Sequence, residues 1–194
     1  LRNKKTSLSD FRKATESLAF LLANKASKHL EKQNIIIETP ITKTTGTKLK
    51  NDIILVPVLR AGLSLVSPFM HFFKDKETKV GFIGARRNEE TAIASIYYQH
   101  LPQISEYDDV IILETMLATA GTASLAIDIL KKAGAKENKI IFVAILASKE
   151  GIKVLSDKYP EVKIVIAETD PTLNDKKYIV PGLGDFGDRF YGTD

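Results

Sequence analysis

Short, continuous apolar runs recur along the chain. They cover residues 53–58, 79–84, 110–113, 140–146 and 162–167 and are rich in Ile, Val and Leu. Such runs are typical of strands that are buried on both faces, because a half-exposed strand would alternate apolar and polar positions. The pattern therefore predicts a set of buried strands.

The first element is a helix. Ser7 followed by Asp10 fits a helix start, in which a Ser or Thr is followed three residues later by an acidic side chain. Beyond it, apolar residues recur at helical spacing and form one face, made of Phe11, Ala14, Leu18, Leu21 and Leu22. We expect an amphipathic helix over residues 8–30.

Further helices alternate with the strands. Helical spacing also covers residues 61–73, 124–134 and 149–158, with an irregularity expected at Pro68. Alternating strands and helices favour an α/β fold with a mostly parallel twisted sheet flanked by helices. A chain of 194 residues without an internal repeat or a linker fits a single domain, residues 1–194.

Residues 85–106 interrupt this alternation. A charged segment at 86–90 is followed by strand character at 93–100, which predicts a projecting β-hairpin arm. Tyr97 and Tyr98 suit an interface, where aromatic residues are enriched, although two tyrosines on a strand are equally ordinary. A plain edge hairpin and a functional flap both remain open.

Composition narrows the class of protein. The net charge of +4 is too mild for a nucleic-acid-binding stripe, and the Lys pairs at 4–5, 131–132 and 176–177 are isolated, as solvated pairs are. No stretch has the ~20 apolar residues that a membrane span needs. The chain has no Cys, which fits a reducing cytoplasm. The histidines at 29, 71 and 100 lack metal-ligand spacing.

The segment 110–123 carries the strongest candidate chemistry. A buried strand leads into a short loop of small and hydroxyl residues, and a helix follows. Backbone N–H groups in such a loop converge with the helix N-terminus into an anion site, to which Thr119 and Thr122 add hydroxyls. The loop lacks the Lys of the Walker pattern and the Gly-x-Gly-x-x-Gly of dinucleotide-binding proteins. An ordinary strand–helix connection is the alternative.

Four motifs in order resemble one family. Met116–Thr119 and the following residues resemble the loop with which type I phosphoribosyltransferases hold the 5-phosphate of phosphoribosyl pyrophosphate (PRPP). Leu59-Arg60-Ala61-Gly62 resembles the pyrophosphate loop of the uracil-specific branch, and residues 80–84 with Arg87 resemble its second PRPP-binding stretch. Residues 178–189 resemble its uracil-binding tail. The resemblance to uracil phosphoribosyltransferases covers the whole chain.

The resemblance implies roles for individual residues. It implies catalytic roles for Arg60 and Asp185. It implies PRPP binding by Arg60, Arg87, Glu114, Thr115, Met116, Leu117, Ala118, Thr119, Ala120, Gly121, Thr122 and Asp185. It implies uracil binding by Ile179, Gly184, Asp185 and Phe186, within a base-binding tail at 168–194. Mg²⁺ would be held by PRPP, and through water by Asp185, with no metal bound directly by the protein.

The implied reaction transfers phosphoribosyl from PRPP to uracil in pyrimidine salvage and gives UMP and pyrophosphate. The resemblance also implies a homodimer or higher homo-oligomer in the cytoplasm, with room for a nucleotide effector and no nucleic-acid or membrane partner. Glu114-Thr115, Ala120 and Phe186 depart from the family pattern. They leave open a catalytically weak homologue that regulates by binding PRPP or a nucleotide, and transfer to another base.

Overall fold

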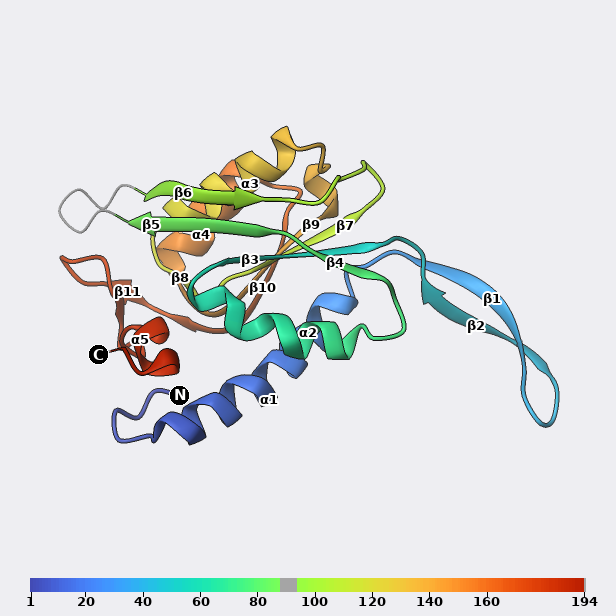
Figure 1. Ribbon diagram of the computed structural model, residues 1–194, viewed down its shortest axis with the longest axis horizontal. Helices are drawn as coiled ribbons and strands as arrows, with labels where there is room; N and C mark the ends of the chain where they lie inside the picture. The colour runs from blue at the N-terminus through green and yellow to red at the C-terminus, as the bar shows by residue number, and fades with distance from the viewer. Residues whose placement is uncertain (88–93, 194) are drawn as a thin grey trace.

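A sheet of mostly parallel strands forms the centre of the protein (Figure 1). The computed structural model describes residues 1–87 and 94–193. The main strands are β3 (Ile53–Leu59), β5 (Phe82–Arg87), β6 (Ala94–His100), β7 (Asp109–Leu113), β9 (Ile140–Ser148) and β10 (Lys163–Asp170). They lie in the order β10-β9-β7-β3-β5-β6, and only β6 is antiparallel to its neighbour. The predicted α/β fold with a mostly parallel sheet is confirmed.

The predicted buried strands match these elements with one change. Instead of one strand over 79–84, β4 (Thr78–Val80) and β5 flank Gly81, whose N–H donates to the carbonyl of Leu55 at 2.9 Å. Every residue of β9 is buried. Ile54 and Val56 of β3 face one core cluster, while Ile53 and Leu55 face the other. The continuous apolar runs follow from this burial on both faces.

Helices cover both faces of the sheet (Figure 1). One core cluster contains residues of α3 (Gly121–Lys132) and α4 (Lys149–Lys158). The other contains residues of α1 (Leu8–Ser27), α2 (Val66–Phe72) and α5 (Phe186–Tyr191). Short 3₁₀ helices span Ala61–Leu65 and Glu137–Lys139. Within the described ranges, none of the helices has the length and apolar character that crossing a membrane requires.

Helix α1 begins as predicted and buries a different face. The hydroxyl of Ser7 accepts a hydrogen bond from the N–H of Asp10 at 3.1 Å, and the helix ends at Ser27 rather than at residue 30. Its buried residues are Phe11, Thr15, Ala19, Leu22, Ala23 and Ala26. Ala14 is exposed and Leu21 is 66% exposed, so the predicted apolar face is wrong at these positions. The small alanines bring α1 close to the sheet, and their weak hydropathy hides this face in the sequence.

The predicted helix over 61–73 consists of the 3₁₀ turn Ala61–Leu65 followed by α2. Pro68 lies in the first turn of α2, where a backbone N–H has no partner within the helix and proline is tolerated. The irregularity therefore precedes Pro68, at the change from 3₁₀ to α-helix, rather than at the proline itself.

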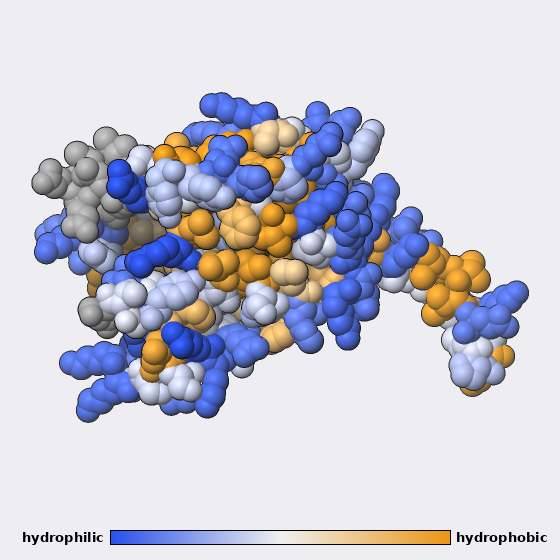
Figure 2. Space-filling model, viewed as in Figure 1, coloured by the Kyte–Doolittle hydropathy of each residue, from blue (hydrophilic) through white to orange (hydrophobic). Residues whose placement is uncertain are grey.

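Two antiparallel hairpins extend the fold. The hairpin predicted within 85–106 is formed by β5 and β6, and residues 88–93 between them lie outside the described residues. A second hairpin, β1 (Lys32–Glu38) with β2 (Lys43–Leu49), was not predicted and projects from the body of the protein (Figure 1). It exposes 73% of Ile36 and 93% of Ile41, and Figure 2 shows the hydrophobic surface along it.

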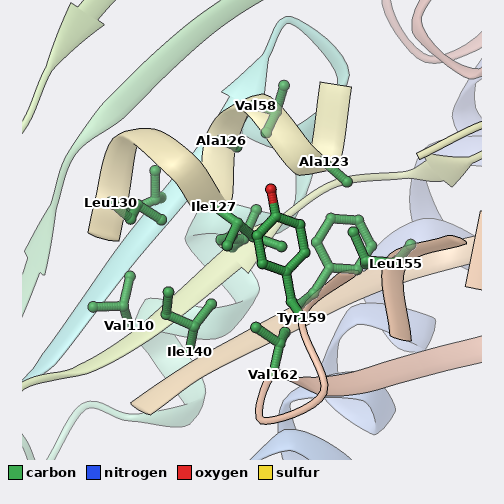
Figure 3. Packing of buried hydrophobic residues seen from close by; sticks show 14 of the residues in the cluster. Val58, Val110, Ala123, Ala126, Ile127, Leu130, Ile140, Leu155, Tyr159 and Val162 are labelled. Atoms are coloured by element: carbon green, nitrogen blue, oxygen red, sulfur yellow. The ribbon is translucent and has the colours of Figure 1, made fainter. Parts of the chain in front are cut away.

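The buried Tyr159 fixes helix α3 above the sheet (Figure 3). Its ring is 2% exposed and belongs to the same core cluster as Ile127. Its hydroxyl lies 2.7 Å from Oδ1 of Asp128 and 3.0 Å from the carbonyl oxygen of Ser124, with one proton to donate between them. Both acceptors belong to α3, so this side chain anchors the start of the helix that follows the loop at 114–120.

Tyr159→Phe should therefore destabilise the protein by about 1 kcal/mol, because the variant keeps the ring and leaves the α3 acceptors without their buried donor. Urea unfolding measures the change. Tyr107→Phe, at a site 69% exposed, is the control and should change stability little. Equal effects of the two variants would show that the buried hydroxyl contributes nothing.

Candidate functional site

A cavity of about 300 Å³ opens where the carboxyl ends of β3 and β7 meet the C-terminal segment of the chain. The structure brings most of the predicted site residues to its walls: Arg60, Glu114, Thr115, Met116, Ala118, Thr122, Ile179, Gly184, Asp185 and Phe186. An adjoining hollow of about 170 Å³ is lined by others, namely Leu117, Thr119, Ala120 and Gly121. A larger hollow of about 520 Å³ at the base of the β1–β2 hairpin contains none of them.

Arg60 extends from the end of β3 toward solvent. Its side chain is 64% exposed, and its guanidinium lies 3.6 Å from the carboxylate of Asp188. The hydroxyl of Tyr191 donates to the carbonyl of Arg60 at 3.1 Å, and the Leu59–Arg60 peptide bond is cis. An exposed ion pair of this kind is worth at most about 1 kcal/mol, so the guanidinium can exchange Asp188 for an anionic ligand.

Gly62 lets the Arg60 loop pack directly on the end of β7. A Cβ at this position would lie 2.1 Å from the carbonyl oxygen of Leu113, a distance no side chain allows. Glu114 is the next residue after Leu113. The missing side chain of Gly62 therefore places the Arg60 loop beside Glu114, on one wall of the cavity.

The carboxylate of Glu114 folds back on its own loop. It accepts a hydrogen bond from the N–H of Thr115 at 2.9 Å and another from the N–H of Met116. Burial nevertheless raises the pKa of Glu114 to about 7, because desolvation of the charge outweighs these two bonds. The uracil-specific branch that the chain resembles has Asp at this position, and the extra methylene of Glu114 is accommodated by this retraction of the carboxylate.

The loop before α3 has the geometry of an anion cradle. Among the described residues, the N–H groups of residues 119–123 have no hydrogen-bond acceptor, and the hydroxyls of Thr119 and Thr122 have none either. These groups line the smaller hollow at the positive end of the α3 dipole. Free N–H donors at a helix N-terminus suit a phosphate group.

Ala120 occupies the left-handed region, with φ 65° and ψ 5°. This conformation costs a residue with a Cβ roughly 1–2 kcal/mol. The alanine is 3% exposed and belongs to the core cluster around α3, so its methyl group packs against the core. The resembled family has Gly at this position, so the alanine strains the backbone, while its burial leaves little of its methyl group facing the smaller hollow.

The C-terminal segment closes the cavity. Strands β11 (Thr172–Leu173) and β12 (Ile179–Val180) pair, and the turn at residues 181–184 leads into α5. Asp170 fixes this turn by accepting from the N–H of Gly182 at 2.8 Å and from both terminal nitrogens of Arg2 at 2.7 Å. The hydrogen bonds with Arg2 hold the pKa of Asp170 below its usual value. This carboxylate links the start of the chain to the predicted base-binding tail.

Phe186 turns away from the cavity. Its ring is 1% exposed, lies 5.2 Å from the ring of Phe11 and stacks on Phe190 at 5.7 Å. The ring therefore neither points to solvent nor lies where it could stack on a base in the cavity. The phenyl ring adds to the core between α1 and α5, and its position there explains why a large residue is compatible with the adjacent cavity.

Some residues at the site were not found from the sequence. Lys177 lines the cavity in a left-handed turn, although its sequence neighbourhood reads as a solvated Lys pair. Asp188 and Tyr191 contact Arg60 from α5. Asp188 lies within the tail motif and Tyr191 just after it, and no further signal in the sequence points to their contact with Arg60. The Arg87 side chain lies outside the described residues.

Two carboxylates that could meet a metal line the cavity. They belong to Glu114 and to Asp185, whose Oδ1 also caps α5 by accepting from the N–H of Asp188 at 2.9 Å. Carboxylate oxygens are ligands that Mg²⁺ prefers. The described part of the chain contains no cluster of three or more His, Cys, Asp or Glu side chains, so further ligands of an ion here would be substrate oxygens or water.

Comparisons with known proteins agree with these features. A model of the uracil phosphoribosyltransferase family matches residues 1–193. The uracil phosphoribosyltransferase of Mycoplasma genitalium is 43% identical over 193 residues, which cover 100% of this chain and 92% of that protein. That of Clostridium botulinum (strain Hall) is 43% identical over 194 residues, covering 100% and 91%.

Solved structures show the same fold. A protein from Aquifex aeolicus superposes with a TM-score of 0.86 at 39% identity and covers 100% of this chain and 91% of its own. A hypoxanthine-guanine phosphoribosyltransferase from Bacillus anthracis has a TM-score of 0.55 at 14% identity, covering 84% and 80%. The second likeness concerns the fold alone.

The strain at Ala120 can be measured by comparing Ala120→Gly with Ala123→Gly. Both alanines are 3% exposed, so both variants lose a similar buried methyl group and gain similar freedom in the unfolded chain. Only Ala120→Gly also relieves a left-handed backbone. We expect Ala120→Gly to be more stable than Ala123→Gly by about 1–2 kcal/mol in urea unfolding. Equal stabilities would contradict the strain.

Glu114 should make stability depend on pH. Its pKa is about 7 in the folded protein against the ordinary value of 4.5 for a glutamate, so the folded state holds the proton more tightly. The free energy of unfolding therefore decreases as pH rises from about 4.5 to 7, by roughly 1–3 kcal/mol in total. Glu114→Gln has no carboxyl group to titrate at this position, so its free energy of unfolding should not show this decrease.

We expect the melting temperature of Glu114→Gln to exceed that of the parent protein clearly at pH 8 and much less at pH 5. Glu16→Gln, an exposed carboxylate on α1, controls for the loss of one negative charge. A difference in melting temperature that is the same at both pH values would rule out the raised pKa.

Proposed function

We propose roles for the cavity residues, starting from the fact that this chain belongs to the uracil phosphoribosyltransferase family. Its reaction transfers the phosphoribosyl group of PRPP to uracil and gives UMP and pyrophosphate. Pyrophosphate is already a good leaving group, so the enzyme needs no covalent nucleophile. Its task is to position two substrates and to stabilise the charge that builds on the leaving oxygen.

The proposed PRPP site spans the two adjoining hollows. The 5-phosphate is bound by the N–H groups of residues 119–122 and the hydroxyls of Thr119 and Thr122, because these are the free donors of the cradle. The ribose lies beside Glu114, whose carboxylate accepts from its hydroxyls. Arg60 binds the pyrophosphate, since its guanidinium can make two parallel hydrogen bonds to phosphate oxygens.

The proposed uracil site lies on the tail. Uracil offers two carbonyls with an N–H between them, and a complementary order of backbone groups can recognise this edge without a special side chain. Ile179, Gly184 and the backbone of Phe186 line the same cavity as Glu114. Because the Phe186 ring is buried elsewhere, base recognition falls to the main chain. Buried groups left unpaired by another base would then give strong discrimination.

Mg²⁺ is proposed as the cofactor on the chemistry of the two cavity carboxylates. When bound with PRPP, it neutralises part of the pyrophosphate charge. Asp185 is the residue placed to contact its water ligands, while Glu114 contacts the ribose. In its ionised form, a carboxylate beside the ribose also favours the oxocarbenium-like character expected there in the transition state.

A homodimer or higher homo-oligomer is also proposed. The β1–β2 hairpin exposes Ile36, Ile37 and Ile41, and an isolated two-stranded hairpin is marginally stable in water. A second subunit that covers these side chains would stabilise it. Cytoplasmic localisation and a nucleotide effector stay predictions, and the described residues single out no site for an effector.

The test of the proposed function is turnover of uracil, PRPP and Mg²⁺, followed as release of pyrophosphate that depends on uracil. Hypoxanthine and cytosine in place of uracil should give little product. Release that is independent of the base, or faster with another base, would contradict the proposed reading of uracil by the tail.

Arg60→Ala should lower kcat/KM for PRPP on the order of a hundredfold, because the guanidinium stabilises the departing pyrophosphate more than the bound substrate. Steady-state kinetics with PRPP varied measure the effect. Lys153→Ala removes a cation that pairs with Asp157 on α4 and should leave kcat/KM unchanged. If folded Arg60→Ala has the same kcat/KM for PRPP as the parent protein, Arg60 does not stabilise the pyrophosphate.

A further inference from the structure

Ser148, the last residue of β9, connects the phosphate loop to helix α4. Its side chain is buried, with 0% of the residue exposed. Its hydroxyl donates to the carbonyl oxygen of Ala118 at 2.6 Å, and the Oγ of Ser148 accepts in turn from the N–H of Gly151 at 2.8 Å. The residue therefore caps α4 and holds the phosphate loop with one oxygen atom.

This contact is the last in a series that runs along β9. The N–H of Glu114 donates to the carbonyl of Val143 at 3.0 Å, and the N–H of Leu146 donates to that of Thr115 at 3.0 Å. Strand β8 (Met116–Leu117) then pairs with β9. After Ala118 the described residues show no further hydrogen bond between β9 and the loop. Ser148 thus holds Ala118, the last loop residue that is hydrogen-bonded to β9, directly before the N–H groups of the cradle.

Gly151 presses on the same peptide group. A Cβ at Gly151 would lie 2.4 Å from the carbonyl oxygen of Ala118 and 2.8 Å from that of Leu117. The backbone of α4 therefore packs against these carbonyls with no side chain between them. The position of the Ala118 carbonyl is determined on one side by contact with Gly151 and on the other by the Ser148 hydroxyl.

The orientation of this carbonyl decides the orientation of the next N–H. The Ala118–Thr119 peptide is not one of the cis bonds, so its C=O and N–H point in opposite directions. With the carbonyl directed at Ser148, the N–H of Thr119 is directed away from β9 and α4. It is the first of the N–H groups at 119–123 that lack an acceptor among the described residues.

We propose that Ser148 is a positioning residue for the 5-phosphate of PRPP: its hydroxyl fixes the Ala118 peptide and so aims the Thr119 N–H at the anion. The inference rests on the proposed use of the loop at 118–122 as the phosphate site. Ser148 does not line either hollow of the site and acts only through the loop.

The competing interpretation is that Ser148 serves only as the N-cap of α4. Ser7→Ala is the matched control for that role, because Ser7 also caps a helix by accepting from the N–H three residues ahead, far along the chain from the phosphate loop. Both Ser148→Ala and Ser7→Ala should lower the melting temperature, as loss of a cap does. Only Ser148→Ala should affect the phosphate.

The experiment combines kinetics with titration by ribose 5-phosphate. Ser148→Ala should raise KM for PRPP and Kd for ribose 5-phosphate about tenfold, the effect of losing one well-placed hydrogen bond. Its kcat and its KM for uracil should stay within about twofold of the parent values. Ser148→Thr keeps the hydroxyl and should restore both phosphate affinities. If Ser148→Ala does not fold, the same constants are measured for Ser148→Gly, which also lacks the hydroxyl, since glycine is tolerated at an N-cap.

The inference is overturned if Ser148→Ala changes KM for PRPP no more than Ser7→Ala does, or if kcat and both KM values change together. Titration with ribose 5-phosphate tests the phosphate site and the role of Ser148 separately. A parent protein that does not bind ribose 5-phosphate overturns the proposed phosphate site and this inference with it. A parent that binds it, with Ser148→Ala binding equally well, overturns the inference alone.

Discussion

Contact of main chain with main chain at the carboxyl edge of the sheet is the constraint on which the site depends. At Gly62 and Gly151 a Cβ would lie 2.1 and 2.4 Å from a carbonyl oxygen of another segment, and at Gly182 it would lie 2.2 Å from the carbonyl oxygen of Ile179 in the same turn. The first two contacts bring the Arg60 loop and the loop at 118–122 into place, and the third shapes the tail. Side chains at these positions would force the backbone segments apart, since real Cβ contacts are longer than 3.0 Å.

The carboxyl edge of the sheet also contains groups that make the folded protein less stable. A carboxylate that is desolvated at Glu114, a left-handed alanine at position 120 and N–H groups without acceptors all lie within one loop. Each costs free energy in the protein without ligand. The surrounding core offsets these costs, because α3 above the loop is fixed by buried apolar contacts and by the Tyr159 hydroxyl. Strain of this kind at a site and rigidity around it commonly occur together.

The sequence predicts the sheet well because burial on both faces leaves an unmistakable pattern, as in β9, where all residues are buried. It fails for the β1–β2 hairpin, since strands that project into water bury neither face, and a segment such as Lys43–Leu49 reads as polar loop. It also misplaces the buried face of α1, where Ala19, Ala23 and Ala26 contribute close packing rather than hydropathy.

Within the candidate site, the motifs predict which residues gather and leave their orientation open. Nothing local shows that Phe186 faces the core, because the partner ring, Phe11, lies at the other end of the chain. The sign of φ at Ala120 and the retraction of Glu114 likewise depend on tertiary contacts. Ser148 escapes sequence analysis for the same reason, since its acceptor is 30 residues away.

The ends of the chain are joined at the tail, and this has a consequence for biosynthesis. The guanidinium of Arg189 donates to the carbonyl of Asn3, 186 residues earlier, and Arg2 reaches Asp170 across 168 residues. Chains emerge from the ribosome with the N-terminus first. Arg2 and Asn3 must therefore wait, without their native partners, until Asp170 and Arg189 have left the ribosome. The cavity wall formed by the tail is consequently assembled late, and a nascent chain that stops before it lacks this wall.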